Sequence, residues 1–313
     1  MSLDVAILGR IGYDLYSEEP GVPFQSVRRF SRYLGGSSAN IAVGLARLGM
    51  RTGILGCVGR DPLGDFLTGF LQAEGVETRH LRALEGYLSS LCLAEISPPD
   101  RFPQVFYRKE AADTQVDLGA EEIQYVCGAR MFLTNGTSLC ASPARESTYR
   151  ALESARAAGR TVVLDVDYRA MSWRSAADAG LAVRLALPFV HILIGNEEEL
   201  RLVAEASDTA SAVRALRDRG LPALVSKLGH RGTQLFADGQ EFFLPPFRVE
   251  VVCSIGAGDG FASGFLYGVL RQMEWPDCLR YGNAAAAIVV SRLSCSEAMP
   301  RLEEIHDLLG KMP

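Results

Sequence analysis

The sequence predicts an α/β protein built on a doubly wound, mainly parallel sheet, with helices on both faces and a small β lid. Short apolar runs rich in β-branched residues alternate with stretches of helical periodicity. This alternation is typical of a parallel sheet that is covered on both faces. No repeat, low-complexity tract or linker divides the 313 residues, so we expect a single domain over residues 1–313.

The apolar runs predict six strands and the periodic stretches between them predict helices. The strands are expected at residues 5–9, 52–59, 130–136, 161–167, 191–196 and 222–229. The helices are expected at residues 38–48, 62–74, 142–158, 197–206 and 209–219.

Two segments, residues 12–34 and 86–110, interrupt this alternation. Both are rich in proline, arginine and aromatic residues, and "SSLCLAEI" alternates as a strand does. We expect them to form an inserted β lid over one edge of the sheet; the alternative is a pair of plain surface loops. The free edges of such a lid offer a surface through which two copies could form a homodimer.

Composition excludes several classes of partner. The formal net charge of −5 disfavours nucleic acid and anionic membranes, and no apolar run reaches the ~20 residues of a membrane span. The seven cysteines include no CxxC pair, which favours reduced thiols and a cytoplasmic location. We therefore expect a cytoplasmic protein that acts on small molecules.

Polar residues gather at or just beyond the predicted carboxyl ends of the strands. In open α/β sheets this edge binds the ligand. The residues concerned are Asp14, Asn135, Asp167, Arg169, Asn196 and Lys227.

The segment "LGGSSANIAVGLARLGM" combines a chain break with a helix start. Gly35 and Gly36 let a ligand approach the backbone, and Ser37 or Ser38 can cap the helix. Asn40 is able to donate and accept hydrogen bonds toward sugar hydroxyls. A plain turn and cap is the alternative.

Two shorter motifs lie on the same predicted edge. In "GNEEEL", Asn196 and Glu199 are close enough to share a ligand or hydrated Mg²⁺, although the motif taken alone favours a capped helix with acids in its first turn. In "SKLGHRG", Gly229 and Gly232 form a turn after a strand that suits a nucleotide. No GxxxxGK[ST] loop is present in the sequence, so this is not a P-loop protein.

The segment "CSIGAGDGFASGF" places small residues and then an acid at the start of an apolar helix. The backbone N–H groups of Gly256, Ala257 and Gly258 form a nest able to hold phosphate. Asp259 would repel that anion unless it serves to accept a proton. An acid that only offsets the helix dipole is the alternative.

These motifs together resemble the ribokinase-type (phosphofructokinase-B) family of carbohydrate kinases, nearly from end to end. The signatures are "GGSSANIAVGLARLG" with "GCVGRDPLGDFL", and "GAGDGFASGF". The resemblance implies a ribokinase-like fold, ATP and Mg²⁺. It also implies that Asp259 is the general base and that Gly256, Ala257 and Gly258 hold the transferring phosphate.

Two further segments, "VFYRKEAAD" and "LDVDYRAMSW", are similar to those of the kinases of 5-dehydro-2-deoxygluconate, which act in inositol catabolism. This similarity implies a small keto-sugar acid as substrate, with Arg108 and Arg169 binding its carboxylate. A 2-keto-3-deoxygluconate kinase or a fructokinase is the alternative within the family. A sugar- or nucleotide-binding regulator without catalysis is the alternative from another class.

The family resemblance also assigns the other site residues. Asp14, Gly35, Gly36 and Asn40 would bind the sugar, and Glu199 would bind Mg²⁺ through water. Asn196, Lys227, Gly229, Gly232 and Asn283 would bind the nucleotide. Many members carry Asp-Thr-Thr where this chain has Cys253-Ser254-Ile255, which leaves a monovalent-cation (K⁺) site open.

Overall fold

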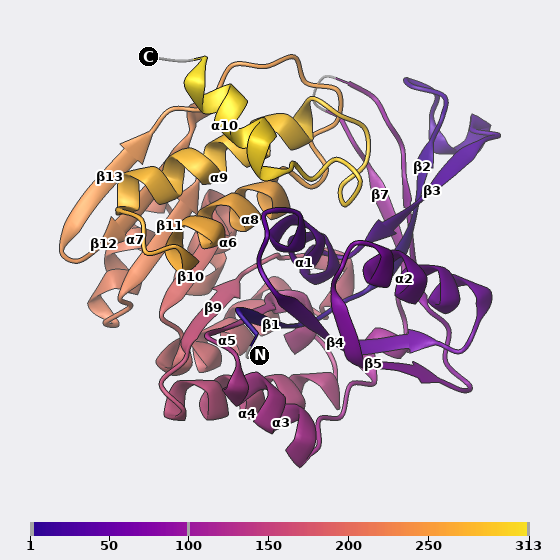
Figure 1. Ribbon diagram of the computed structural model, residues 1–313, viewed down its shortest axis with the longest axis horizontal. Helices are drawn as coiled ribbons and strands as arrows, with labels where there is room; N and C mark the ends of the chain where they lie inside the picture. Colours follow the sequence, from indigo (N-terminus) through magenta and orange to yellow (C-terminus); the bar gives the residue numbers. More distant parts are fainter. Residues whose placement is uncertain (1–2, 99–100, 312–313) are drawn as a thin grey trace.

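The computed structural model describes residues 3–98 and 101–311, and its main element is a nine-stranded sheet (Figure 1). The strand order is β13-β12-β11-β10-β9-β8-β1-β4-β5. The bounds are β1 Val5–Leu8, β4 Thr52–Gly59, β5 Glu77–Leu84, β8 Met131–Asn135, β9 Thr161–Asp165, β10 Ile192–Asn196, β11 Ala223–Lys227, β12 Thr233–Ala237 and β13 Gln240–Leu244.

Strands from β5 to β11 are parallel to their neighbours, and β12 and β13 are antiparallel. The mainly parallel sheet is therefore confirmed, and each of the six predicted strands is present with ends shifted by at most two residues. β5, β12 and β13 were not predicted. β5 is half-buried along most of its length, so it lacks the continuous apolar run that marks the central strands.

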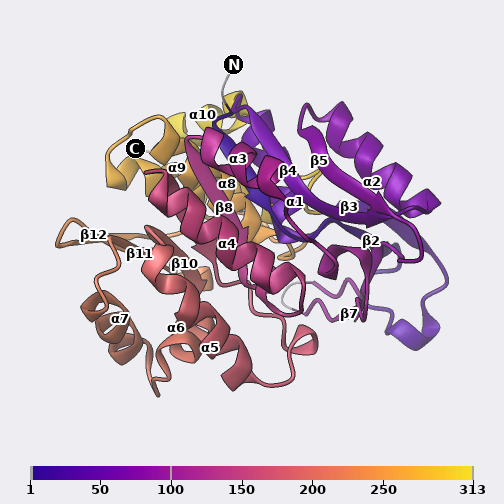
Figure 2. The same cartoon turned by 90° about the horizontal axis from the view of Figure 1, so that it is seen from below.

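Ten helices of the described chain cover the two faces of this sheet (Figures 1 and 2). One face carries α1 Ser37–Arg47, α2 Pro62–Ala73, α8 Ala257–Leu270, α9 Trp275–Val290 and α10 Leu302–Gly310. The other carries α3 Ala120–Gly128, α4 Ala144–Ala157, α5 Ala176–Ala186, α6 Glu197–Ala204 and α7 Thr209–Asp218. Val5 and Ile7 of β1 join the first core, and Ala6 and Leu8 join the second. This alternation is what strand geometry requires of a sheet with two buried faces.

Helix α8 lies in the first core, where it packs closely against α9. A Cβ atom on Gly264 would lie 2.2 Å from the carbonyl oxygen of Tyr281, so the close approach of the two helices requires glycine there. The position of α8 is thereby fixed, and its N-terminus lies at the carboxyl edge of the sheet, next to residues that follow β9 and β11.

A second, four-stranded sheet stands beside the main one, with strand order β3-β2-β6-β7 (Figure 1). Its strands are β2 Gly12–Ser17, β3 Phe30–Gly35, β6 Ser90–Ala94 and β7 Gln104–Tyr107. These strands lie in the two segments expected to form a β lid, except that β3 ends at Gly35, one residue beyond the first segment. The small sheet predicted as part of the fold is confirmed. Residues 99 and 100 of the second segment lie outside the described residues.

Short 3₁₀ helices connect several of these elements. They are η1 Phe24–Ser26, η2 Ala112–Thr114, η3 Gly136–Leu139, η4 Ala170–Ser172, η5 Leu187–Phe189 and η6 Gly229–Arg231. Within residues 3–98 and 101–311, no helix has the length and apolar character needed to cross a membrane.

Candidate active site

Three cavities follow one another along the carboxyl edge of the main sheet. The inner cavity, of about 40 Å³, lies against the small sheet. The middle cavity has a volume of about 440 Å³ and the outer one about 590 Å³. Asp167, Arg169 and Asp259 line both the inner and the middle cavity, whereas Lys227 and Gly258 line both the middle and the outer one. The row can therefore hold two ligands that meet near Asp259.

The N-terminus of α8 opens into the middle cavity. Gly256 is its N-cap, with φ of 87°, and no side chain caps the helix. The amide of Ala257 donates to Ser254, while those of Gly258 and Asp259 have no acceptor among the described residues. Two free N–H groups at the positive end of a helix suit an anionic oxygen. The nest predicted from Gly256, Ala257 and Gly258 differs in one donor, because the amide of Ala257 is used within the protein.

Asp259 is bound to a helix that lies far away in the sequence. Asn40 of α1 donates from Nδ2 to Oδ2 of Asp259 over 2.8 Å, across 219 residues. Oδ1 of Asn40 is buried with no hydrogen-bond partner, and Asn40 lines the inner cavity. Asn40 thus holds the carboxylate in place and still presents an acceptor to a ligand.

The predicted caps of α1 are wrong. The N-cap is Gly36 and not a serine, and no side chain forms a capping hydrogen bond at this end of the helix, which begins at Ser37. The hydroxyl of Ser37 is buried without a partner and lines the inner and middle cavities. Ser38 instead accepts from Asn135 over 2.9 Å, which places Asn135 inside the structure and outside the lining of all three cavities.

Asp14 was expected at or just beyond the carboxyl end of a strand of the main sheet, and this expectation is wrong. The chain leaves β1 at Leu8 and enters the small sheet at Gly12, so Asp14 lies within β2. It still lines the inner cavity, together with Gly36. Burial raises the pKa of Asp14, and Nη2 of Arg10 lies 3.3 Å from its Oδ1.

Arg108 and Arg169 both line the inner cavity, but their surroundings differ. Arg108 directly follows β7 and is buried among acceptors of the protein itself, including Asp113 at 2.6 Å. Arg169 follows β9, is about half exposed, and has one ion pair, with Asp167 at 2.9 Å. Asp167 raises the pKa of Arg169, which keeps the guanidinium charged. Of these two arginines, Arg169 is the one that can bind a ligand without giving up a protein contact.

The middle cavity contains a buried ion pair below the nest. Nζ of Lys227, at the end of β11, lies 3.1 and 3.2 Å from the two carboxylate oxygens of Asp165. Burial lowers the pKa of Lys227, but Asp165 and Glu199 raise it by more, so the ammonium group stays charged. A Cβ on Gly258 would lie 3.3 Å from this Nζ, which places the cation beside the anion nest.

Asn196 and Glu199 form the capping box that the sequence left as the alternative. Oε2 of Glu199 accepts from the amide of Asn196 over 2.7 Å, and Oε1 accepts from the amide of Tyr168 over 3.0 Å. Both residues line the middle cavity, but the two carboxylate oxygens of Glu199 are already bonded. A direct metal bond is therefore disfavoured, and contact through water remains compatible with this geometry.

The outer cavity is lined by glycines and apolar side chains. Gly229 and Gly232 bound the turn after β11. The side-chain amide of Asn283, on α9, forms hydrogen bonds within the protein. Its oxygen accepts from Thr233 over 2.9 Å, and its nitrogen donates to the carbonyl of Pro245 over 3.0 Å. Asn283 therefore positions the wall of this cavity and has no free side-chain donor pointing to a nucleotide. The apolar lining includes Phe247, Val249, Val251, Ala286 and Val290.

Several residues of the site were missed by sequence reasoning. Arg10, Gln104 and Phe106 line the inner cavity, and Asp165 lines the middle one. Arg10 lies in "GRIGYDL", between the first strand and a glycine, and a charged residue directly after a buried strand was the available signal. Gln104 had none, because a polar residue in an alternating strand is expected to face solvent.

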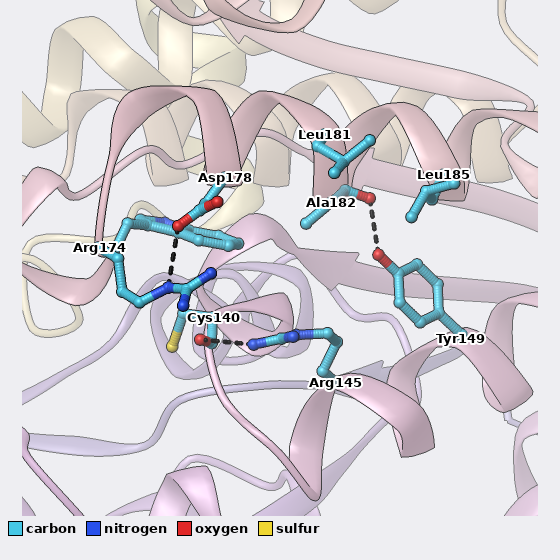
Figure 3. Close-up of a pocket in the computed structure, with 9 residues that line it drawn as sticks. Cys140, Arg145, Tyr149, Arg174, Asp178, Leu181, Ala182 and Leu185 are labelled. Carbon is cyan, nitrogen blue, oxygen red and sulfur yellow. Dashed lines mark hydrogen bonds and ion pairs between the residues drawn. The ribbon is translucent and has the colours of Figure 1, made fainter.

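A further cavity of about 440 Å³ lies outside this row, between α4 and α5 (Figure 3). Arg145 donates to the carbonyl of Cys140, and Tyr149 donates to the carbonyl of Ala182. The thiol of Cys140 also contacts Arg108, so this cavity lies behind the arginine that lines the inner one.

The chain is similar to known proteins over nearly its whole length. Residues 2–302 match the family described as pfkB family carbohydrate kinase. A 5-dehydro-2-deoxygluconokinase of Shouchella clausii is 37% identical over 98% of this chain and 95% of its own. The structure of a Xylella fastidiosa fructokinase with bound ATP is 25% identical, with a TM-score of 0.86 over 98% of both chains. That of a Salmonella enterica aminoimidazole riboside kinase, complexed with aminoimidazole riboside and an ATP analogue, is 27% identical, with a TM-score of 0.83 over 97% and 99%.

Proposed function

The chain belongs to the pfkB family of carbohydrate kinases, and we propose that it phosphorylates a hydroxyl of a small keto-sugar acid, 5-dehydro-2-deoxygluconate, with ATP as donor. The position of Asp259 carries this proposal. Its carboxylate lies where the inner and middle cavities meet, beside two free amides and bonded to Asn40. A proton acceptor next to an anion site is what phosphoryl transfer to an alcohol requires.

In this mechanism Asp259 accepts the proton of the substrate hydroxyl. The hydroxyl oxygen forms a bond to the γ-phosphorus as the bond from that phosphorus to the leaving ADP oxygen breaks. The free amides of Gly258 and Asp259 stabilise the charge on the transferring group, with Lys227 and Arg169 nearby. General-base assistance contributes roughly 10²–10⁴-fold, and one anion-hole donor about 10²–10³-fold.

The nucleotide is proposed to occupy the outer cavity, with its phosphates in the middle one. Apolar walls around Phe247 and Val251 suit an adenine ring, and the turn at Gly229 and Gly232 leaves room for backbone contact. Mg²⁺, when bound to the phosphates, would neutralise their charge. Asp167 and Glu199 are the carboxylates able to hold it through water, which suits an ion that keeps several waters.

The substrate is proposed to bind in the inner cavity, where Asp14, Asn40 and Ser37 offer hydrogen-bonding groups to its hydroxyls. At about 40 Å³ this cavity is far below the roughly 300 Å³ of ordinary ligand sites. The small sheet would therefore act as a lid that moves away to admit substrate and closes over it. The name of the Shouchella clausii relative, and the presence in the inner cavity of Arg169 with a single ion pair, favour an acid over a neutral sugar.

A K⁺ ion is not proposed at Cys253. This thiol is fully buried in a cluster with Tyr16, Ala94, Ile96 and Cys295, and burial raises its pKa. Hard cations take oxygen ligands, and the side chains of this cluster offer none apart from one phenol, which contacts Cys295. The residues present do not fit the ion.

The proposal also covers the cellular location and the oligomeric state. All seven cysteines are free thiols, which supports a reducing compartment such as the cytoplasm. β3 and β7 are the edge strands of the small sheet, and a second copy could pair with one of them. Sedimentation of the purified protein would measure whether a dimer forms.

The proposed reaction is tested by coupled ADP release with a panel of substrates. The panel contains 5-dehydro-2-deoxygluconate, 2-keto-3-deoxygluconate and fructose, each with ATP and Mg²⁺. We expect the highest kcat/KM for 5-dehydro-2-deoxygluconate. A preference for fructose would support a fructokinase instead, and binding without ADP release on any substrate would support a regulator.

A further inference from the structure

We propose that Arg10 recognises the carboxylate of the substrate, together with Arg169, and that Arg108 does not. This inference rests on the proposed acid kinase function and names the residue that would make the enzyme specific for an acid. It follows from an account of the hydrogen-bond donors of the arginines that line the inner cavity.

Arg108 has no donor to spare. A guanidinium carries five N–H donors. Nε lies 2.7 Å from Oδ2 of Asp113, and Nη2 lies 2.6 Å from the same oxygen and 2.9 Å from the carbonyl of Thr137. Nη1 lies 3.2 Å from Sγ of Cys140 and 3.3 Å from Oγ of Ser172. Arg108 thus ties the end of β7 to the loops after β8 and β9, and a ligand would have to displace one of these contacts.

Arg10 is buried to a similar degree but uses only part of its guanidinium. Nε donates to Oγ of Ser90 over 3.0 Å, and Nη2 lies 3.3 Å from Oδ1 of Asp14. Nη1 has no acceptor among the described residues, although the side chain is only 7% exposed. Three of its five donors are therefore available. Free donors on a charged guanidinium that lines a cavity suit a ligand that supplies acceptors.

A glycine on each of two paired strands leaves space for Arg10 and Asp14. Gly12 of β2 pairs with Gly35 of β3 in the small sheet. A Cβ on Gly12 would lie 2.2 Å from Nη2 of Arg10, and one on Gly35 would lie 2.1 Å from the carboxylate of Asp14. This pair of glycines makes room for a buried ion pair that faces the inner cavity.

The ion pair fixes the orientation of the cation. Asp14 holds Nη2 on one side, Ser90 holds Nε, and the ring of Phe106 lies 5.3 Å from the guanidinium carbon. The Nη1 edge is left for the cavity. A guanidinium held in this way can bind a carboxylate through charge-assisted bonds, and Arg169, which has one protein partner, comes from a different element.

The test compares Arg10→Met with Arg108→Met on two substrates. One is 5-dehydro-2-deoxygluconate, and the other is its methyl ester, which has the same carbon chain without the charge. We expect Arg10→Met to raise the KM for the acid roughly tenfold or more, with kcat and the KM for ATP little changed. The kcat/KM for the ester should change less than about threefold. Arg10→Lys, which keeps the charge but not the planar fork, should give an intermediate KM.

Arg108→Met is the matched control, since it removes an equally buried arginine from the same cavity. We expect it to lower the thermal stability and to impair acid and ester alike. An acid-selective loss in Arg108→Met, or equal losses on both substrates in Arg10→Met, would overturn the assignment of Arg10. If Arg10→Met does not fold, a wild-type KM for the acid in Arg10→Lys would also overturn it. A wild-type enzyme that favours the ester or fructose over the acid would remove the proposed function as well.

Discussion

The inner and outer cavities are lined by different parts of the chain and suit different ligands. Buried charged side chains from separate parts of the sequence line the inner cavity, including Arg10, Asp14, Arg108 and Asp167. Glycines and apolar side chains make up most of the lining of the outer cavity, and all of that lining comes from residues 227–290. The sugar end therefore depends on ion pairs between distant segments, whereas the nucleotide end depends on backbone shape and apolar surface.

This difference indicates what a substitution at each end can change. A charged side chain with a buried partner contributes direction and specificity, and removing it leaves an unpaired group. An apolar wall changes affinity in smaller steps, about 25 cal/mol for each Å² of surface. Residues between the two cavities serve both ligands, so they are expected to control turnover. Four experiments test this difference between the two ends of the site.

The largest effect is expected from Asp259→Asn, at the junction. The amide is nearly the same size but cannot accept the proton, so kcat should fall by at least ~10²-fold. The affinity for ATP, measured by calorimetry, should stay within about threefold because the outer cavity is unchanged. Near-normal turnover would remove Asp259 from the role of base.

Lys227→Met, in the middle cavity, tests the ion pair with Asp165. Removing one member of a buried pair costs about 3–5 kcal/mol of unfolding free energy. Burial raises the pKa of Asp165 to about 7, and Lys227 limits the rise. Because the folded protein then holds a proton that the unfolded chain releases near pH 4, this carboxyl makes the protein less stable as the pH rises through 7.

Urea unfolding at pH 5 and pH 8 measures this effect. We expect Lys227→Met to lose more stability relative to the wild type at pH 8 than at pH 5. At pH 8 Asp165 of the wild type is ionised beside its cation, whereas the variant has no cation to favour the ionised form; at pH 5 the carboxyl is protonated in both. Asp165→Asn with Lys227→Met is the matched control and should show little dependence on pH between these values. An equal loss at both pH values would show that the pair contributes no charge interaction.

Gly35→Ala should affect only the inner cavity. Its Cβ would lie 2.1 Å from the carboxylate of Asp14, so that side chain must move. We expect the KM for the sugar acid to rise roughly tenfold, as for one lost bond to a charged group, while the KM for ATP changes less than about twofold. Gly69→Ala, on α2 with no atom near the new methyl group, is the control and should behave as the wild type. An equal rise in both KM values would contradict the separation of the two ends.

The smallest effect is expected from the monovalent cation. Because the thiol of Cys253 is buried among apolar groups, exchanging K⁺ for tetramethylammonium at constant ionic strength should change kcat/KM less than about twofold. Steady-state rates over a K⁺ titration measure this directly. A saturable activation of several-fold by K⁺ would show that a cation binds by other ligands.

Much of the architecture could be predicted because its signals are local. The central strands are buried on both faces, so each is a continuous apolar run, and β4 begins and ends where it was expected. The free amides of Gly258 and Asp259 follow from a helix that starts with small residues and no cap. Such features depend on neighbours within a few residues, and the sequence alone contains that information.

The partners of the polar side chains were decided only by the tertiary structure. Asn40 was expected to face a sugar, and it also holds Asp259 across 219 residues. Arg108 was expected to bind a carboxylate of the substrate, but its donors are taken by four residues of the protein, while Arg10, bound to Ser90 across 80 residues, keeps three free. A hydrogen bond forms only within about 3 Å and at a suitable angle. Which groups come that close depends on how the helices and both sheets pack together, and no local pattern in the sequence encodes that distance.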